Sequence, residues 1–133
     1  MPQIADWDED GDLDLLVGDR DGYIWLYLNS GTATNPVLNF AGRITANSRA
    51  IDVGENSCLV VADWNDDGKK ELIIGDNNGY VYYHENIGTD ASPNFASNGG
   101  VCLKTQGGSD IKVFYGAQVD AADWNAVQKL KFV

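Results

Sequence analysis

Residues 6–18 read DWDEDGDLDLLVG, and the pattern of this stretch returns further along the chain. Its acidic side chains occupy the first, third, fifth and ninth positions of a short loop: Asp6, Asp8, Asp10 and Asp14. Gly11 permits a sharp turn between them, because glycine adopts backbone angles that other residues avoid. Oxygen ligands at this spacing are typical of calcium loops, in which the backbone carbonyl of the seventh position, here Asp12, is a further ligand. The stretch therefore predicts a calcium site over residues 6–14.

The residues after this loop indicate that it leads into a strand. A helical calcium hand places a bidentate Glu at its twelfth position, but that position is Val17 here, inside an apolar run. Close carboxylates repel each other by roughly 4 kcal/mol per pair at an effective dielectric constant of 20, so a cation is needed to make the loop compact. The alternative is an acidic turn that holds no metal, since Asp and Gly are also ordinary turn residues.

The chain contains an internal repeat. Aligning it with itself at an offset of 57 residues (63 − 6) places Asp6 on Asp63, and the match continues through the following strands to Pro36 and Pro93. Phe40 and Phe95 then correspond with a slip of two residues. A constant offset through loop, strand and turn indicates that one supersecondary unit has been duplicated. The second loop spans residues 63–71 and carries three acids at ligand positions: Asp63, Asp67 and Glu71.

Short apolar runs mark the strands of each repeat. Residues 15–17 and 72–74 are apolar throughout, as expected for core strands that are covered on two sides. Polar turns that end in Gly22 and Gly79 are hairpin signals, and each leads into a further strand. These signals place the other strands at residues 23–28, 43–45, 58–62 and 80–84.

About four short strands per repeat, joined as a meander and without helical periodicity, are typical of a β-propeller blade. The predicted fold is all-β and has two four-stranded blades and the start of a third. Blade 1 covers residues 1–56, blade 2 covers residues 57–115, and a truncated blade 3 with a degenerate loop covers residues 116–133. A closed propeller needs about four or more blades, so either the sequence is a piece of a larger protein or copies of the chain close one ring. Two isolated blades would expose a large apolar area, which motivates the homo-oligomer.

The composition limits the partners and the compartment. The formal net charge of −11 argues against nucleic acid or an anionic membrane surface, and two calcium ions would bring it to −7. No apolar run is long enough to span a bilayer. The chain has no signal peptide before the first loop, which we interpret as a property of a fragment. Cys58 and Cys102 form either a disulfide or two buried thiols, and neither belongs to a CxxC or metal-binding pattern.

The sequence offers little for catalysis. His84 is the single histidine and is expected to face solvent or a neighbouring blade, and no familiar hydrolase or phosphate-binding motif is present. The paired carboxylates are better used as calcium ligands, so we expect no enzymatic activity.

The aromatic residues divide into two groups. Those that recur at the second loop position are expected to pack beside the metal: Trp7, Trp64 and Trp124. Those that differ between the repeats are candidates for ligand or partner contacts, although packing in the core or between blades is the favoured interpretation: Trp25, Tyr27, Tyr82 and Tyr83.

The two repeats, ADWDEDGDLDLLVGDRDGYIWLYLNSGT and VVADWNDDGKKELIIGDNNGYVYYHENIGT, resemble the FG-GAP or VCBS repeat family of calcium-dependent β-propellers, and integrin-type propellers have similar loops. The resemblance implies that each loop joins the first and second strands of a blade. It also implies that the second site takes one amide and one backbone carbonyl beside its carboxylates. The implied ligands are Asp63, Asn65, Asp67, Lys69 through its carbonyl, and Glu71.

The family likeness leaves two functions open. Its members occur mostly in extracellular or surface proteins, as adhesion or ligand-binding modules and as parts of polysaccharide-degrading proteins. The first expectation is a non-catalytic, calcium-binding module at the cell surface that binds carbohydrate or protein. The alternative is a fragment of a propeller enzyme such as a polysaccharide lyase, with its catalytic residues outside this chain.

We predict that the chain binds two calcium ions and none at its third loop remnant. Residues 122–125 reproduce residues 62–65 at a spacing of 60 (123 − 63), but the Asp and Gly of the turn do not follow Asp123 and Asn125. Lys131 stands at the position of Asp14 and Glu71, so a cation replaces an anionic ligand. A metal titration checks this stoichiometry, and a third bound ion would contradict it.

Overall fold

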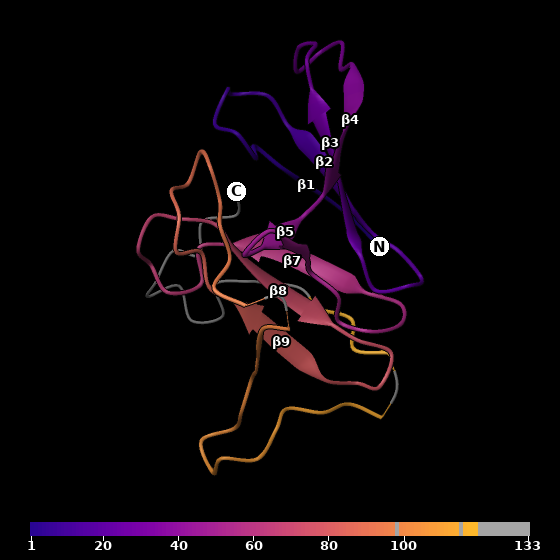
Figure 1. The fold of residues 1–133 in the computed structure, drawn as a ribbon, viewed down its shortest axis with the longest axis vertical. Coiled ribbons are helices and arrows are strands. Elements are labelled where there is room, and N and C mark those ends of the chain that lie inside the picture. The colour runs from indigo at the N-terminus through magenta and orange to yellow at the C-terminus, as the bar shows by residue number, and fades with distance from the viewer. Residues whose placement is uncertain (98, 115, 120–133) are drawn as a thin grey trace.

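The computed structural model describes residues 1–97, 99–114 and 116–119, and these residues form β-strands and turns without any helix. All strand pairs are antiparallel, in two sheets of four strands and one of two (Figure 1). The all-β prediction is confirmed. The strands are β1 (Pro2–Ala5), β2 (Asp14–Gly18), β3 (Ile24–Asn29), β4 (Leu38–Arg43), β5 (Thr45–Ala46), β6 (Arg49–Ala50), β7 (Cys58–Ala62), β8 (Glu71–Gly75), β9 (Val81–His84) and β10 (Val101–Cys102).

The two four-stranded sheets have the same construction. Their strand orders are β1-β2-β3-β4 and β7-β8-β9-β10, so each is a meander in which consecutive strands pair. Each second hairpin turn is closed by an aspartate, whose Oδ1 accepts a hydrogen bond from the backbone N–H four residues on: Asp19 from Tyr23 at 2.9 Å, and Asp76 from Tyr80 at 2.8 Å. The residue before each tyrosine is a glycine with positive φ, a conformation that disfavours any side chain.

The chain segment that leaves each sheet runs back along the turn of that sheet. Ser57 N–H donates to the Asp19 carbonyl at 3.2 Å, and Ala117 N–H donates to the Asp76 carbonyl at 2.9 Å. A side chain at Gly18 would collide with the backbone of Ser57. The path from one unit to the next is therefore repeated together with the sheet itself.

One hydrophobic core lies between the two four-stranded sheets. On the first sheet, Leu16, Ile24 and Leu26 are buried in it, and on the second sheet Leu72 and Ile74 meet them. The pairs on β3 and β8 are two residues apart, as side chains on one face of a strand must be. Further members come from the loops and from the β5-β6 hairpin: Trp7, Ile44, Ala46, Ile51, Val53 and Phe95.

The two sheets differ in how far they are covered. All five residues of β8 are buried, whereas β2 buries Asp14 and Leu16 and leaves Leu15 and Val17 partly exposed. The prediction of a strand covered on two sides therefore holds for β8 and is wrong for β2. The reason is that the second sheet has the first sheet on one face and Val119 packed on Val60 and Ala62 of the other.

Two details of the strand prediction need correction. The last strand of the first sheet is β4, over Leu38–Arg43, and lies earlier than the expected strand at 43–45. Phe95 pairs with Asn86 as Leu38 pairs with Asn29, so Leu38 and not Phe40 is its counterpart. An irregularity in the β3-β4 register beside Leu26 shifts the later residues of the strand.

Cys58 and Cys102 are free thiols and do not form a disulfide with each other. Cys58 is buried and Cys102 is half-buried. The two four-stranded sheets lie on either side of residues 56 and 57, where the boundary between the first two blades was predicted. The division into blades stays a prediction, and the predicted remnant at Asp123 and Asn125 lies outside the described residues.

Replacing Phe95 by Ala should lower the free energy of unfolding by about 3 to 5 kcal/mol, because the ring is fully buried between the sheets. Its centroid lies 6.2 Å from that of Trp7. Phe40→Ala is the matched control, since Phe40 is 59% exposed and should cost less than about 1.5 kcal/mol. Denaturant unfolding in calcium measures both losses, and equal losses would contradict the assignment of the core.

His84 is buried against expectation. Its side chain is 1% exposed, its Nδ1 lies 2.9 Å from the Ser97 carbonyl, and its Nε2 has no hydrogen-bond partner among the described residues. Burial lowers the pKa of His84 from 6.5 to about 4, because the charged imidazolium loses its hydration. The prediction that His84 faces solvent or a neighbouring blade is therefore wrong, because the side chain lies in the interior.

The stability of the fold should therefore fall as the pH drops from about 6.5 toward 4. In this range the unfolded chain binds a proton at His84 that the folded chain does not bind, so protonation favours unfolding. The full loss is about 3 kcal/mol for this pKa difference. An NMR titration of His84 gives its pKa directly, and a value near 6.5 would contradict the buried position. His84→Asn should flatten this part of the stability profile.

Candidate metal centres

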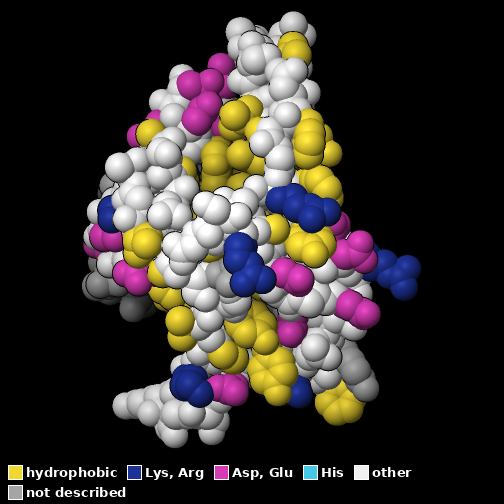
Figure 2. Space-filling model, viewed as in Figure 1, with side chains coloured by type: hydrophobic (Ala, Val, Ile, Leu, Met, Phe, Trp, Pro, Cys, Tyr) yellow, Lys and Arg dark blue, Asp and Glu magenta, His cyan; other side chains and the backbone are white. Residues whose placement is uncertain are grey.

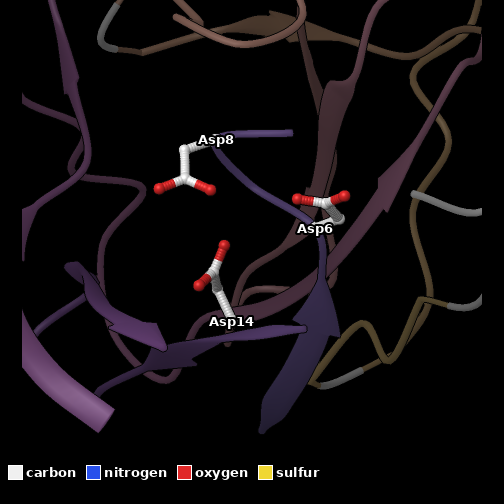
Figure 3. Close-up of side chains that lie close together, drawn as sticks. All are labelled: Asp6, Asp8 and Asp14. Atoms are coloured by element: carbon white, nitrogen blue, oxygen red, sulfur yellow. The ribbon is translucent and has the colours of Figure 1, made fainter. Parts of the chain in front are cut away.

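The first acidic loop brings three carboxylates together. Asp6 directly follows β1, Asp14 opens β2, and Asp8 lies in the loop between them. One oxygen from each of these three residues lies within 4.8 Å of the others. Figure 3 shows the carboxylates of Asp8 and Asp14 pointing toward each other with Asp6 alongside. In Figure 2, Asp and Glu side chains gather at the upper left, where Figure 1 draws the indigo loop.

Backbone N–H groups hold this loop in shape. Gly11 N–H donates to Asp6 Oδ2 at 3.1 Å, which closes the turn. Asp14 receives two donors, Trp7 N–H on Oδ2 and Asn29 N–H on Oδ1, both at 2.7 Å. Because Asn29 ends β3, the carboxylate of Asp14 connects the loop to two strands of the sheet.

The second loop repeats this arrangement. Asp63, Asp67 and Glu71 each offer one oxygen within 4.8 Å of the others. Gly68 N–H donates to Asp63 Oδ2 at 2.9 Å, and Trp64 N–H donates to Glu71 Oε2 at 2.8 Å, as in the first loop. The backbone turns also agree, with φ of 96° at Gly11 and 87° at Gly68, and of 63° at Glu9 and 60° at Asp66.

Both clusters fit a divalent cation. Asp14 is 1% exposed and Glu71 is fully buried, so their charges are largely removed from water. Each cluster contains a buried carboxylate oxygen that has no hydrogen-bond donor among the described residues, Asp6 Oδ1 in the first and Glu71 Oε1 in the second. A buried anionic oxygen without a donor is costly unless a positive charge faces it. Hard oxygen ligands of this kind suit Ca²⁺.

The pKa values of two cluster carboxylates also reflect the cost of burying negative charge. Burial, together with nearby carboxylates, raises the pKa of Asp14 above its usual value. Burial also raises the pKa of Glu71 to about 7, and the negative charges of Asp67 and Asp63 act in the same direction. A bound cation would oppose both effects and favour the charged form of Glu71.

Two predicted ligands outside these clusters, Asp10 and Asn65, use their side chains to hydrogen-bond the backbone of their own loops. Asp10 Oδ1 accepts from Asp12 N–H at 2.8 Å, and Asp67 Oδ1 accepts from Lys69 N–H at 2.9 Å. Asn65 Oδ1 accepts from Asp67 N–H at 3.1 Å. The assignments of Asp10 and Asn65 as ligands, and of Asp12 and Lys69 as carbonyl ligands, therefore stay predictions.

Sequence reasoning missed a buried lysine beside the second cluster. Lys70 is fully buried, and its Nζ lies 2.9 Å from Asp90 Oδ1 and 3.9 Å from Glu9 Oε1 of the first loop. The first repeat has Leu13 and Ala33 at the corresponding positions, and both line one pocket there. The joint change of two apolar positions to a Lys and an Asp is a signal for this ion pair in the sequence.

The repeated tryptophans do not share one environment. Trp7 is buried against Phe95 of the second repeat, which agrees with a packing role, but Trp64 is 45% exposed. Trp124 lies outside the described residues. Phe40 packs against both Trp25 and Tyr27, with ring centroids 5.6 Å apart in each pair.

Comparison with known proteins identifies the repeat. A family model described as an FG-GAP-like repeat matches residues 6–74, which is just over half of the chain and contains both acidic loops. No curated protein and no solved structure matches the chain. The matched segment begins at Asp6, the first of the predicted ligands, and ends at Ile74 in β8. The chain belongs to the family of FG-GAP-like repeat proteins.

Proposed function

We propose that this chain is a calcium-dependent, non-catalytic repeat module in which each acidic loop binds one Ca²⁺. The observation that carries the proposal is the pair of carboxylate clusters, which occur at the same place in two repeats of the matching family. Asp6, Asp8 and Asp14 hold the first ion, and Asp63, Asp67 and Glu71 hold the second. The residues left over in each loop shape the turn and complete the ligand set.

In this proposal the ion stabilises the end of each sheet. The loop between the first two strands of a unit carries like charges that repel each other, and a divalent cation turns this repulsion into attraction. Because Asp14 also accepts hydrogen bonds from Trp7 and Asn29, neutralising it fixes the loop to β3. A ligand that binds only the folded state adds directly to the free energy of unfolding.

We further propose that the two units are blades of a β-propeller. Two four-stranded meanders of the same strand order stack on one shared core, and the connecting path is repeated with them, which supports this arrangement. The described residues supply two such blades, whereas the smallest propellers have about four, so a closed ring needs further blades.

We also propose that the module works outside the cell and binds carbohydrate or protein. FG-GAP-like repeats are typical of extracellular proteins, which supports this location. None of the described residues lies in a helix that is long and apolar enough to cross a membrane. The buried position of His84 supports a structural role for the single histidine over a role as a catalytic base.

Thermal melts in millimolar calcium and in EDTA test the metal sites. Calcium at about 100 times its dissociation constant should add about 2.7 kcal/mol per site, enough to raise Tm by roughly 5 to 15 °C. Asp14→Asn and Glu71→Gln should each remove the rise due to one site, which is about half of the total rise, because each disables one cluster. Asp21→Asn is the matched control, since Asp21 is an exposed acid outside both clusters. A melt that does not respond to calcium would overturn the proposal.

Binding to immobilised glycans in the presence and absence of calcium tests the ligand class. The carbohydrate hypothesis gains support if the calcium-loaded chain retains a glycan family that the EDTA-treated chain releases. Turnover of an acidic polysaccharide by this chain alone would instead overturn the non-catalytic assignment.

A further inference from the structure

The first acidic loop rests on the second unit through the residues that alternate with its proposed ligands. Asp6 and Asp8 contribute their carboxylates to the first cluster. Trp7, which lies between them, is buried in the core shared with the second sheet. Glu9, the residue after Asp8, brings its Oε1 to 3.9 Å from Nζ of Lys70. The shape of the first loop therefore decides how two of its side chains meet the second unit.

Lys70 belongs to the second loop and lies between two of its proposed ligands, Lys69 and Glu71. Its side chain is fully buried. Its backbone N–H donates to Asp90 Oδ1 at 2.8 Å, and its Nζ donates to the Asp90 carbonyl at 2.6 Å and lies 2.9 Å from Oδ1. A buried ammonium group depends on such partners, because an unpaired charge in the interior is costly. Lys70 is thus held by Asp90 of its own unit and by Glu9 of the first loop.

The repeat supplies a counterpart for each side of this contact. Asp66 has the position in the second loop that Glu9 has in the first, and their φ values are 60° and 63°. Asp66 is exposed and makes no ion pair with another described residue. The counterpart of Lys70 is Leu13, which is 51% exposed. Both counterparts lack the contact between units, so they provide matched controls.

We propose that Lys70 couples the two calcium sites, so that an ion bound at one site raises the affinity of the other. This inference rests on the proposed calcium binding and adds its regulation. Binding at the first site holds Asp8, and with it the neighbouring Glu9, against Lys70. Binding at the second site holds Glu71, and with it Lys70, against Asp90. Each ion orders one half of the same contact, so the second ion to bind loses less conformational entropy in ordering its loop.

Repulsion between the two ions acts against this coupling. The three carboxylates of each cluster keep a net charge of −1 after a divalent ion binds (−3 + 2), which weakens the repulsion. Salt screens exposed charges beyond about 8 Å at physiological ionic strength, and it screens a buried pair much less. We therefore expect ordering to dominate, with a coupling factor of about fivefold, which is the low end of known couplings between sites.

Calorimetric titration with calcium at physiological ionic strength tests the coupling. The coupling factor is the product of the two wild-type binding constants divided by the product of the constants of the single-site variants Asp14→Asn and Glu71→Gln. It should be about fivefold in the wild-type chain and about 1 when all three chains also carry Glu9→Asn. Asp66→Asn is the matched control, since it removes an acid at the same loop position without touching the first unit, and it should keep the factor.

A double variant changes the other side of the contact. Lys70→Leu together with Asp90→Ala restores the apolar pair of the first repeat, Leu13 and Ala33. Because both charges are removed together, neither is left buried without its partner. Calcium should still bind at both sites, with a coupling factor of about 1. This variant covers the case in which Glu9→Asn disturbs the first loop.

Amide hydrogen exchange reports the same coupling without a binding constant. In Glu71→Gln only the first site binds calcium, and filling it should slow the exchange of the Lys70 N–H, which donates to Asp90 in the other unit. The slowing should disappear when Glu9→Asn is added.

The outcomes separate this inference from the proposed function. A chain that binds no calcium would overturn both. Two bound ions with a wild-type coupling factor of about 1 or below would overturn the coupling alone. So would a factor that Glu9→Asn and the double variant both leave unchanged.

Discussion

The crowding of carboxylates in two short loops is the constraint on which the rest of this structure depends. Each loop places three acidic oxygens within 4.8 Å of one another at the end of a sheet, and the backbone around them supplies fewer donors than these oxygens can use. The turn glycines and the N–H groups of Gly11 and Gly68 close the loops tightly enough to force this proximity. A positive charge facing such a loop stabilises it, and this links the fold of each sheet to the proposed calcium ion.

The two acidic loops differ in the hydrogen bonds and charges that surround their buried carboxylates. Asp14 has hydrogen bonds on both oxygens, whereas the longer Glu71 has one on Oε2 and leaves Oε1 without a donor. Beside the second loop, Lys70 is buried on Asp90 and reaches Glu9 of the first loop. A buried lysine is tolerated only where anions surround it. The second loop is therefore the more buried of the two and is tied to the first by charge.

The sequence predicted what depends on local spacing. The acids of both loops, the duplicated unit and the strands β2, β3, β7, β8 and β9 follow from residues that are close together in the chain, whereas β4 lies earlier than predicted and β10 was not predicted. It did not predict what depends on a neighbouring sheet. Trp7 and Trp64 have the same local sequence, yet one is buried and the other is 45% exposed, because only Trp7 has Phe95 beside it. Leu38 is the counterpart of Phe95 at the same offset of 57 residues, and this match follows from their pairing with Asn29 and Asn86 and not from residue type.

The measurement that tests the central claim most directly is a crystal structure grown with calcium and analysed by anomalous scattering. The account predicts two anomalous peaks, one among Asp6, Asp8 and Asp14 and the other among Asp63, Asp67 and Glu71, with oxygens about 2.3 to 2.6 Å from each ion. Density with no anomalous signal at either cluster, or an ion bound at a different set of oxygens, would contradict it.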